Sequence, residues 1–137
     1  MRSATVLTLL LLSGCTFVDV RETTWDATQD PRAKDVAGRC FELLRDAVVY
    51  SAGEQTRWLA VPNDRQTSSS DGDGRIVPKG SRLVIASVSA THYPQVGTTL
   101  KPYARIDGEL VAAGQLFYFQ AGSDPLRPRE DDIARCD

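Results

Sequence analysis

Three cysteines and a single histidine are the side chains of this 137-residue chain best suited to nucleophilic or metal chemistry. With His92 as general base, a serine hydrolase would also need a Gly-x-Ser-x-Gly turn, which the sequence lacks. A zinc site would need several His or Cys ligands, and a redox-active thiol usually has a nearby Cys or His. Neither Cys40 nor Cys136 lies in a Cys-x-x-Cys pair or near the histidine. We therefore expect neither a hydrolase nor a thiol enzyme.

Carboxylates are the other side chains with possible chemistry. Asp71 and Asp73 lie in an Asp-Gly-Asp-Gly run that could ligate calcium, but the third acid and downstream glutamate of an EF-hand loop are missing. A plain solvated turn is the alternative interpretation. Asp131 and Asp132 are adjacent, so they point apart and indicate surface. We predict no catalytic residues, no cofactor and no metal; acids brought together by folding are the remaining enzymatic alternative.

The N-terminus has the features of an export signal. Met1 and Arg2 are followed by an apolar stretch over residues 4–12, which is far shorter than the roughly 20 residues of a transmembrane helix. The run Leu12-Ser13-Gly14-Cys15 directly after it resembles a bacterial lipobox. This resemblance implies that Cys15 is acylated, for example by palmitate, and becomes the mature N-terminus. The alternative is an ordinary cleaved signal with an incidental cysteine.

The lipoprotein resemblance also implies a location. In such proteins an aspartate after the modified cysteine commonly directs retention in the inner membrane, whereas this chain has Thr16. We expect a lipid-anchored protein of the cell envelope, at the outer membrane and facing the periplasm. Acyl chains bind a bilayer without any further apolar segment.

Composition and length limit the domain organisation. Charged residues make up 25% of the chain and the formal net charge is −2, which excludes the basic surface of a nucleic-acid binder. We predict a signal peptide over residues 1–14, a lipidated N-terminus and tether over 15–29, and a single globular β domain over 30–137. With Cys15 acylated, Cys40 and Cys136 remain as an even pair in an oxidising compartment, and we predict that they form a disulfide.

The first part of the domain has one clear helix signal. Asp30-Pro31 is an N-cap followed by proline, so a short helix over residues 31–37 should end at Gly38. Residues 39–50 fit either one face of a helix or two strands with a kink at Arg45-Asp46, and their β-preferring side chains favour strands.

The later part of the chain shows strand and turn signals. We expect a polar loop over 63–74, a hairpin turn at Asp107-Gly108, a helical turn near 130–135 after the prolines that end regular structure, and strands over 58–61, 81–88, 103–107, 110–113 and 116–119. The expected fold class is mainly β: a small SH3-like barrel or compact β-sandwich with short helical turns near both ends.

A second resemblance concerns the barrel. Residues 76–85 are similar to the Val-Leu-Pro-x-Gly-Thr-x-Leu-x-Val stretch of bacterial SH3-like domains, and residues 103–108 resemble their later strand and turn. The likeness spans residues 39–120 through about ten positions, and departs in lacking a tryptophan at the later strand and in an insertion over 89–102. Such domains bind cell-wall peptides or proteins, but no binding residue can be transferred, because fold does not fix function.

Aromatic side chains are the best candidates for recognition. Trp58, Tyr93, Tyr103 and Tyr118 are candidates for a recognition groove, and of these Trp58, Tyr93 and Tyr103 are predicted to bind a partner, with Tyr93 in a loop and most exposed. Phe117 and Phe119 are expected to fill the core. We expect a non-enzymatic binding or accessory module with a protein or peptidoglycan partner. The alternatives are a structural envelope lipoprotein without a specific ligand and, third, a wall-directed hydrolase.

Overall fold

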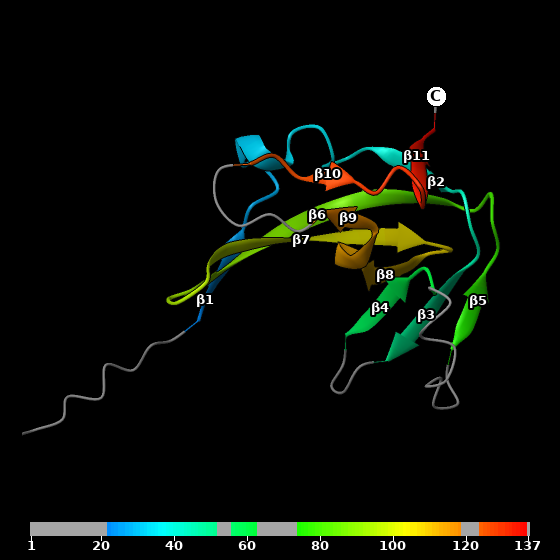
Figure 1. Ribbon diagram of the computed structural model, residues 1–137, viewed down its shortest axis with the longest axis horizontal. Helices are drawn as coiled ribbons and strands as arrows, with labels where there is room; N and C mark the ends of the chain where they lie inside the picture. The colour runs from blue at the N-terminus through cyan, green and yellow to red at the C-terminus, as the bar shows by residue number, and fades with distance from the viewer. Residues whose placement is uncertain (1–21, 52–55, 63–73, 119–123, 137) are drawn as a thin grey trace, which may run out of the picture.

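The computed structural model describes residues 22–51, 56–62, 74–118 and 124–136, and these form a mainly β domain (Figure 1). The strands of the main sheet are β1 (Thr23–Asp26), β2 (Cys40–Leu43), β3 (Ala47–Ser51), β4 (Arg57–Ala60), β5 (Arg75–Val77), β6 (Arg82–Tyr93), β7 (Gly97–Ile106), β8 (Glu109–Ala112) and β11 (Ile133–Arg135). A second sheet contains β9 (Phe117–Tyr118) and β10 (Arg127–Pro128). The short 3-10 helices are η1 (Pro31–Ala33) and η2 (Gly114–Leu116).

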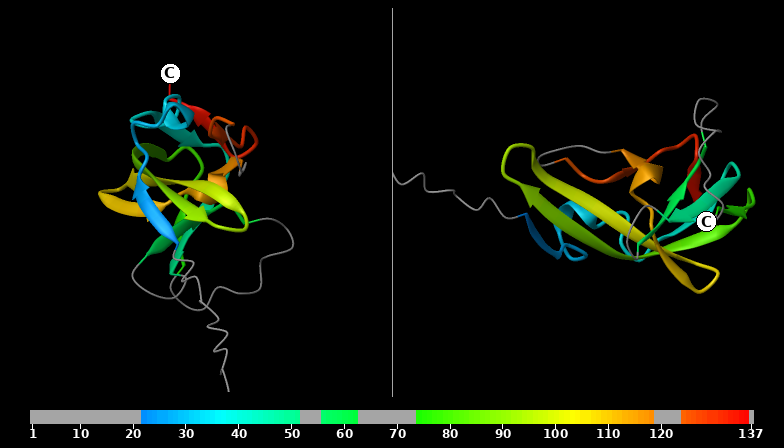
Figure 2. Two further views of the ribbon diagram at one scale, coloured as in Figure 1. Left: turned by 90° about the vertical axis from the view of Figure 1, so that its left-hand side faces the viewer. Right: turned by 90° about the horizontal axis from the view of Figure 1, so that it is seen from below.

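The main sheet is curled rather than flat, as the two further views show (Figure 2). Its strand order is β11-β2-β6-β7-β8-β4-β3-β5, with β1 paired to the outer half of β6. All of these pairs are antiparallel except β4 with β8. The curled sheet agrees with the expected small β barrel or sandwich.

The core lies inside the curl and is apolar. Every fully or nearly fully buried side chain in its cluster is hydrophobic, and the largest are Phe41, Phe117, Leu43, Leu59, Leu83, Ile85, Ile106, Leu116 and Ile133. Phe41 and Phe117 meet edge to face, with ring centroids 5.7 Å apart and an interplanar angle of 89°. This contact joins the main sheet to the small β9–β10 sheet, which therefore covers the open side of the core.

The helix predicted over residues 31–37 is present only as the 3-10 helix η1, Pro31–Ala33, which turns follow. The Asp30 carboxylate accepts a hydrogen bond from the backbone N–H of Arg32 at 2.9 Å, and Pro31 occupies the first turn. The Arg32 guanidinium also donates to this carboxylate at 2.8 Å, and these hydrogen bonds lower the pKa of Asp30 to about 2. Gly38 follows with a φ of +74°, a conformation that favours glycine, and ends the turn before β2.

The ambiguous segment 39–50 is extended, as predicted. It forms β2 and β3, and the break falls at residues 44–46, where the kink was expected. The reason is the alternation of buried positions: Phe41 and Leu43 in β2 and Ala47 and Val49 in β3 all face the core. The period of two therefore prevailed over the helical pattern.

The hairpin predicted at Asp107-Gly108 is confirmed. Both residues have positive φ, at 49° and 79°, and this pair of conformations matches the twist of the two strands that it joins. The turn brings β8 back along β7, with Tyr103 opposite Ala112 and Arg105 opposite Leu110.

An ion-pair network stabilises the curl at the end of the sheet. Glu109 in β8 accepts hydrogen bonds from Arg57 in β4 at 2.7 Å and from Arg75 in β5 at 3.0 Å. Arg75 also contacts Asp107 at 3.1 Å. Since β8 and β5 are separated by two strands in the order of the sheet, the contact between Arg75 and Glu109 connects strands that only the curl brings together.

The predicted disulfide between Cys40 and Cys136 is present, with an S–S distance of 2.05 Å and a Cα–Cα distance of 5.3 Å. It joins residues 96 positions apart in the sequence. Beside it, the backbone N–H of Cys136 donates to the carbonyl of Cys40 at 3.1 Å. The bond therefore attaches the C-terminal strand β11 to β2.

Residues 89–102, an insertion relative to the SH3-like pattern, continue two strands, so Tyr93 is not in the loop where it was expected. β6 runs to Tyr93 and β7 begins at Gly97, so the segment is the outer half of a long hairpin. A register shift between Ile85 and Ser87 gives β6 one extra residue, as in a β-bulge. This shift turns Val88 and Ala90 to the core face, where strict alternation from Ile85 would place them on the other side.

The expected tether ends earlier than predicted. Residues 16–29 showed no period in the sequence, but Thr23–Asp26 is the strand β1, with Thr23 opposite His92 and Asp26 opposite Ser89. All four residues are exposed, so no alternation of polar and apolar residues could reveal the strand. The folded domain therefore includes residues before position 30.

The C-terminal segment also differs from the prediction. Residues 129–133 do form one hydrogen-bonded turn, since the N–H groups of Asp132 and Ile133 both donate to the Arg129 carbonyl at 3.0 Å. Arg135 is not part of it but lies in β11, opposite Phe41. Pro128 does not end regular structure either, because it pairs with Phe117 in the small sheet. The expected strand over 116–119 is reduced to Phe117–Tyr118 in the described residues.

Candidate binding surface

The predicted chemical residues do not converge in the described part of the chain. Cys15, Asp71, Asp73 and Phe119 lie outside the described residues, as do most of the polar loop and the whole predicted signal. His92 is exposed, and its Nδ1 lies 3.2 Å from the Thr98 hydroxyl. Among the described residues, His, Cys, Asp and Glu side chains form no group of three or more that could hold a metal ion.

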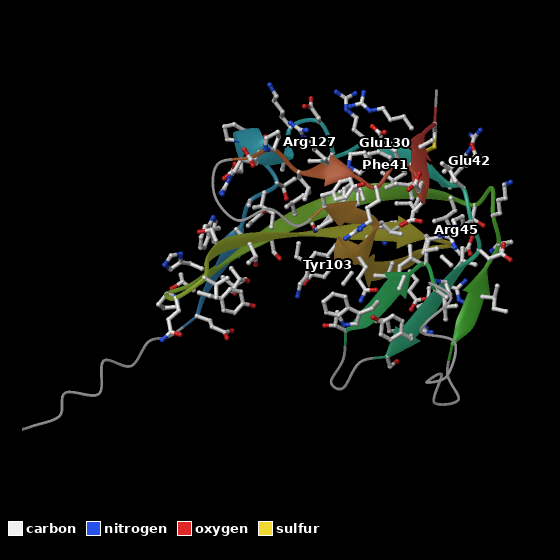
Figure 3. All side chains as sticks on the ribbon, in the orientation of Figure 1. Phe41, Glu42, Arg45, Tyr103, Arg127 and Glu130 are labelled. Carbon is white, nitrogen blue, oxygen red and sulfur yellow. A yellow bond between two sulfur atoms is a disulfide. The ribbon has the colours of Figure 1, made fainter. Side chains whose placement is uncertain are left out.

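Two of the three predicted binding aromatics share one face of the sheet. Tyr103 in β7 and Trp58 in β4 are both register partners of Ala112 in β8, and Tyr50 in β3 is the partner of Trp58. Register partners project from the same face of a sheet. Tyr103, Ala112, Trp58 and Tyr50 therefore form a line across four strands, which we call the aromatic row; Tyr103 projects from β7 next to β8 (Figure 3).

Adjacent strands lie about 4.8 Å apart, so Tyr103 and Trp58 flank Ala112 with Cα atoms about 10 Å from each other. Ala112 is fully buried, whereas Tyr103, Trp58 and Tyr50 are partly exposed. The small alanine thus lies between two large aromatic side chains that reach solvent. The residues next to them along each strand, such as Leu59 beside Trp58, face the core. The aromatic row therefore occupies the outer face of the curl.

Polar contacts hold the aromatic side chains in place. The ammonium group of Lys101 lies 4.7 Å from the centroid of the Trp58 ring, within the range of a cation–π interaction. The Gln115 side-chain amide donates to the Tyr50 hydroxyl at 2.6 Å. These contacts restrict the rotamers of both aromatic residues before any partner binds, which lowers the entropic cost of binding.

A second line of outer-face residues adjoins the aromatic row. Val84, Arg105 and Leu110 are register partners across β6, β7 and β8. Val84 is 44% exposed and Leu110 is 48% exposed, so both present apolar surface to solvent. The two lines together present aromatic, aliphatic and cationic groups, and this is the chemistry found at protein contact surfaces.

The structure does not bring Tyr93 to the aromatic row. It is the last residue of β6, opposite Gly97, at the turn of the long hairpin. It is also partly buried rather than the most exposed aromatic, since Trp25 and Tyr118 are 40% and 46% exposed. Tyr93 was expected in a loop because Pro94 follows it. The loop contains only residues 94–96, so Tyr93 belongs to β6.

The remaining aromatic residues divide between core and surface. Phe117 is buried, as expected. Tyr118 is exposed on β9, with the Arg129 guanidinium 4.9 Å from its ring centroid. It lies in the small sheet and not in the aromatic row.

Sequence reasoning missed Tyr50, Lys101 and Gln115. Lys101 lies two positions before Tyr103 on one strand, so period two alone could have placed both on one face. The position of Tyr50 could not be found in this way, because its contact with Trp58 depends on which strands pair.

Within the described residues, no helix is long or apolar enough to cross a bilayer.

The chain was compared with models of protein families, with curated proteins and with solved structures, and none of them matches. The fold, the disulfide and the surface define the class of this protein: a disulfide-linked, mainly β domain with aromatic side chains on the outer face of its sheet.

Proposed function

We propose that this protein is a lipid-anchored envelope protein whose β domain is a non-enzymatic binding module. The observation that carries this proposal is the aromatic row, in which Trp58 and Tyr103 flank Ala112 on the outer face. Its partner is a protein or a peptidoglycan segment. The anchor is the acylated Cys15, at the outer membrane and facing the periplasm.

The aromatic row supports binding because its side chains are large, partly exposed and already ordered. Tyr, Trp and Arg are enriched among the residues that dominate binding energy. Here Tyr103 lies two residues before Arg105 on β7, and Arg105 has Val84 and Leu110 as its exposed neighbours. The cation–π contact with Lys101 accounts for the position of the Trp58 ring alone. It does not account for the exposed Val84 and Leu110 on the same face.

The disulfide supports export. Disulfides persist in oxidising compartments such as the bacterial periplasm and are rare in the cytosol. Cys40 and Cys136 are bonded to each other, so Cys15 is the one cysteine left for acylation. This agrees with the lipobox Leu12-Ser13-Gly14-Cys15 directly after the apolar stretch.

Substitution of the anchoring residue tests the first half of the proposal. We expect Cys15→Ser to abolish labelling by radioactive palmitate and to leave a soluble or uncleaved precursor, because the acyl chains are the membrane attachment. Labelling and fractionation of cell envelopes measure both effects. The same substitution leaves the disulfide intact, so the thermal stability of the domain is the control. A palmitate-labelled Cys15→Ser product would contradict the anchor.

The second test concerns the aromatic row. We expect Trp58→Ala to weaken partner binding by about 2 kcal/mol, or about 30-fold in Kd, if Trp58 is a dominant contact. Pull-down from detergent-solubilised envelope and co-sedimentation with isolated sacculi identify the partner, and titration then measures the affinity. Tyr118→Ala is the matched control, because it removes an exposed aromatic from the other sheet.

The outcomes separate the classes of function. Binding that is lost with Trp58→Ala and kept with Tyr118→Ala supports the module. Sacculus association that neither variant alters would indicate a structural lipoprotein instead. A clear band in a peptidoglycan zymogram would overturn the non-enzymatic proposal.

A further inference from the structure

The domain has one end at which the chain from Cys15 enters the fold. β1 begins at Thr23, and its register partner is His92, one residue before the end of β6. The start of β1 therefore lies beside the turn of the β6–β7 hairpin. Figure 1 shows this turn at one end of the long axis of the domain, with β5 at the opposite end.

The turn of this hairpin exposes apolar groups. Val96 is 62% exposed, and Pro94 and Gln95 beside it are also exposed. Tyr93 is partly exposed at the end of β6, and Trp25 in β1 is 40% exposed. Trp25 pairs with Ala90, three residues along β6 from Tyr93, so it lies about 10 Å from the turn at the strand rise of about 3.3 Å per residue. We call residues 93–97 the hairpin tip.

The outer part of the long hairpin also lacks charged residues. Between Arg82 and Lys101 the sequence contains no Asp, Glu, Lys or Arg, although such residues make up 25% of the whole chain. Twelve of these eighteen residues, 89–100, belong to the outer half of the hairpin. A surface strand or turn in contact with water alone rarely lacks charged residues over such a length, because charged side chains are the usual surface type.

The length of chain before the domain limits the distance to the membrane. Six residues separate Cys15 from Glu22, and the seven Cα–Cα steps between the two span at most about 25 Å when fully extended. The twelve residues of β6 are about 40 Å long at the rise of a strand. The tether is therefore shorter than the hairpin, and it enters the domain at the hairpin tip rather than at the end occupied by β5.

We propose that the hairpin tip is a second membrane contact, which rests on the lipid surface and orients the domain. This inference deepens the proposed function and rests on the lipid anchor at Cys15. Val96 and Pro94 enter the interfacial region, and Tyr93 and Trp25 lie at headgroup level, where Tyr and Trp are enriched in membrane proteins. The occupant is a neutral lipid surface, since the hairpin tip has no charge with which to select anionic lipids.

The consequence is a defined orientation of the aromatic row. The acyl chains supply the attachment, and the hairpin tip decides which part of the domain faces the bilayer. With the tip on the lipid, β3, β4 and β8 are held away from it, and Trp58 remains accessible to a partner in the periplasm.

Fluorescence quenching by brominated lipid tests this orientation on the full, acylated chain. The natural tryptophans are first replaced by Trp25→Phe and Trp58→Phe, which leave one aromatic ring at each position. In this background Val96→Trp places a reporter at the hairpin tip and Ile76→Trp places a matched reporter on β5. Both positions are exposed branched aliphatic residues, at 62% and 69%, so neither change disturbs the core. Gln95→Trp is the second tip reporter if Val96→Trp does not fold.

In vesicles of zwitterionic phosphatidylethanolamine and phosphatidylcholine with brominated acyl chains, we expect the reporter at the tip to lose most of its emission and the reporter on β5 to keep it. High salt should leave this difference unchanged. Equal quenching at both positions, or none at the tip, would overturn the proposal, as would quenching that high salt abolishes. Mass spectrometry of the same samples distinguishes the two failures: an acylated, vesicle-bound protein with an unquenched tip contradicts this inference alone, whereas a protein without acyl chains contradicts the anchor and this inference together.

Discussion

The double variant Cys40→Ala/Cys136→Ala is expected to lose about 4 to 5 kcal/mol of unfolding free energy, the largest effect of any change in the domain. The disulfide closes a loop across 96 positions, and a cross-link of this length removes much of the entropy of the unfolded chain. Domains of this size have only about 5 to 15 kcal/mol of net stability, so the variant should be near the limit of folding.

Urea denaturation of the domain without its lipid measures this loss. The folded state keeps the pairing of β11 with β2, including the hydrogen bond from Cys136 to the Cys40 carbonyl, because neither depends on the sulfur atoms. The native protein with its disulfide reduced is the matched control and should lose a similar amount. A change below about 1 kcal/mol would show that the cross-link does not restrict the unfolded chain in the way that loop closure predicts.

The second large effect is expected at the centre of the core, where Phe41→Ala should cost about 3 to 5 kcal/mol. Phe41 is fully buried in β2 and contacts Phe117 edge to face. Truncation leaves a cavity between the two sheets and removes an aromatic pair that contributes about 1 kcal/mol beyond its burial. Because β2 also pairs with both β6 and β11, the strand cannot move to fill the space without loss of register.

Val84→Ala is the control for this prediction. Val84 lies on the neighbouring strand β6 but faces solvent, so its truncation should change stability by about 0.5 kcal/mol or less. Chemical denaturation gives the free energies, and near-ultraviolet circular dichroism reports the packing of the aromatic core. Equal losses in the two variants would mean that Phe41 is not a central core residue.

Local chemistry is what made parts of the fold predictable. Asp107-Gly108 specifies a tight hairpin because it supplies two consecutive residues that tolerate positive φ. Asp30-Pro31 specifies the start of a helical turn because a side-chain cap and a fixed φ act within three residues. The strands β2 and β3 were found because their side chains prefer the strand conformation.

Other elements could not be found because their local sequence has no pattern. β1 is exposed at all four positions, so its strand conformation comes from hydrogen bonds to the outer half of β6. β11 has one buried residue, Ile133, and it owes its place to β2 and the disulfide. The true length of β6 was hidden by a bulge, which changes the phase of alternation halfway along the strand.

The sequence by itself determined the mainly β fold class, the pairing of Cys40 with Cys136 and the choice of Trp58 and Tyr103 as aromatic candidates, because residue types and the number of cysteines decide each of these. Only the tertiary structure decided that Trp58 and Tyr103 flank Ala112 while Tyr93 lies at the far end of the hairpin. The physical reason is that a surface of this kind depends on the register of strands 45 positions apart, and register is fixed by the packing of the opposite, buried face.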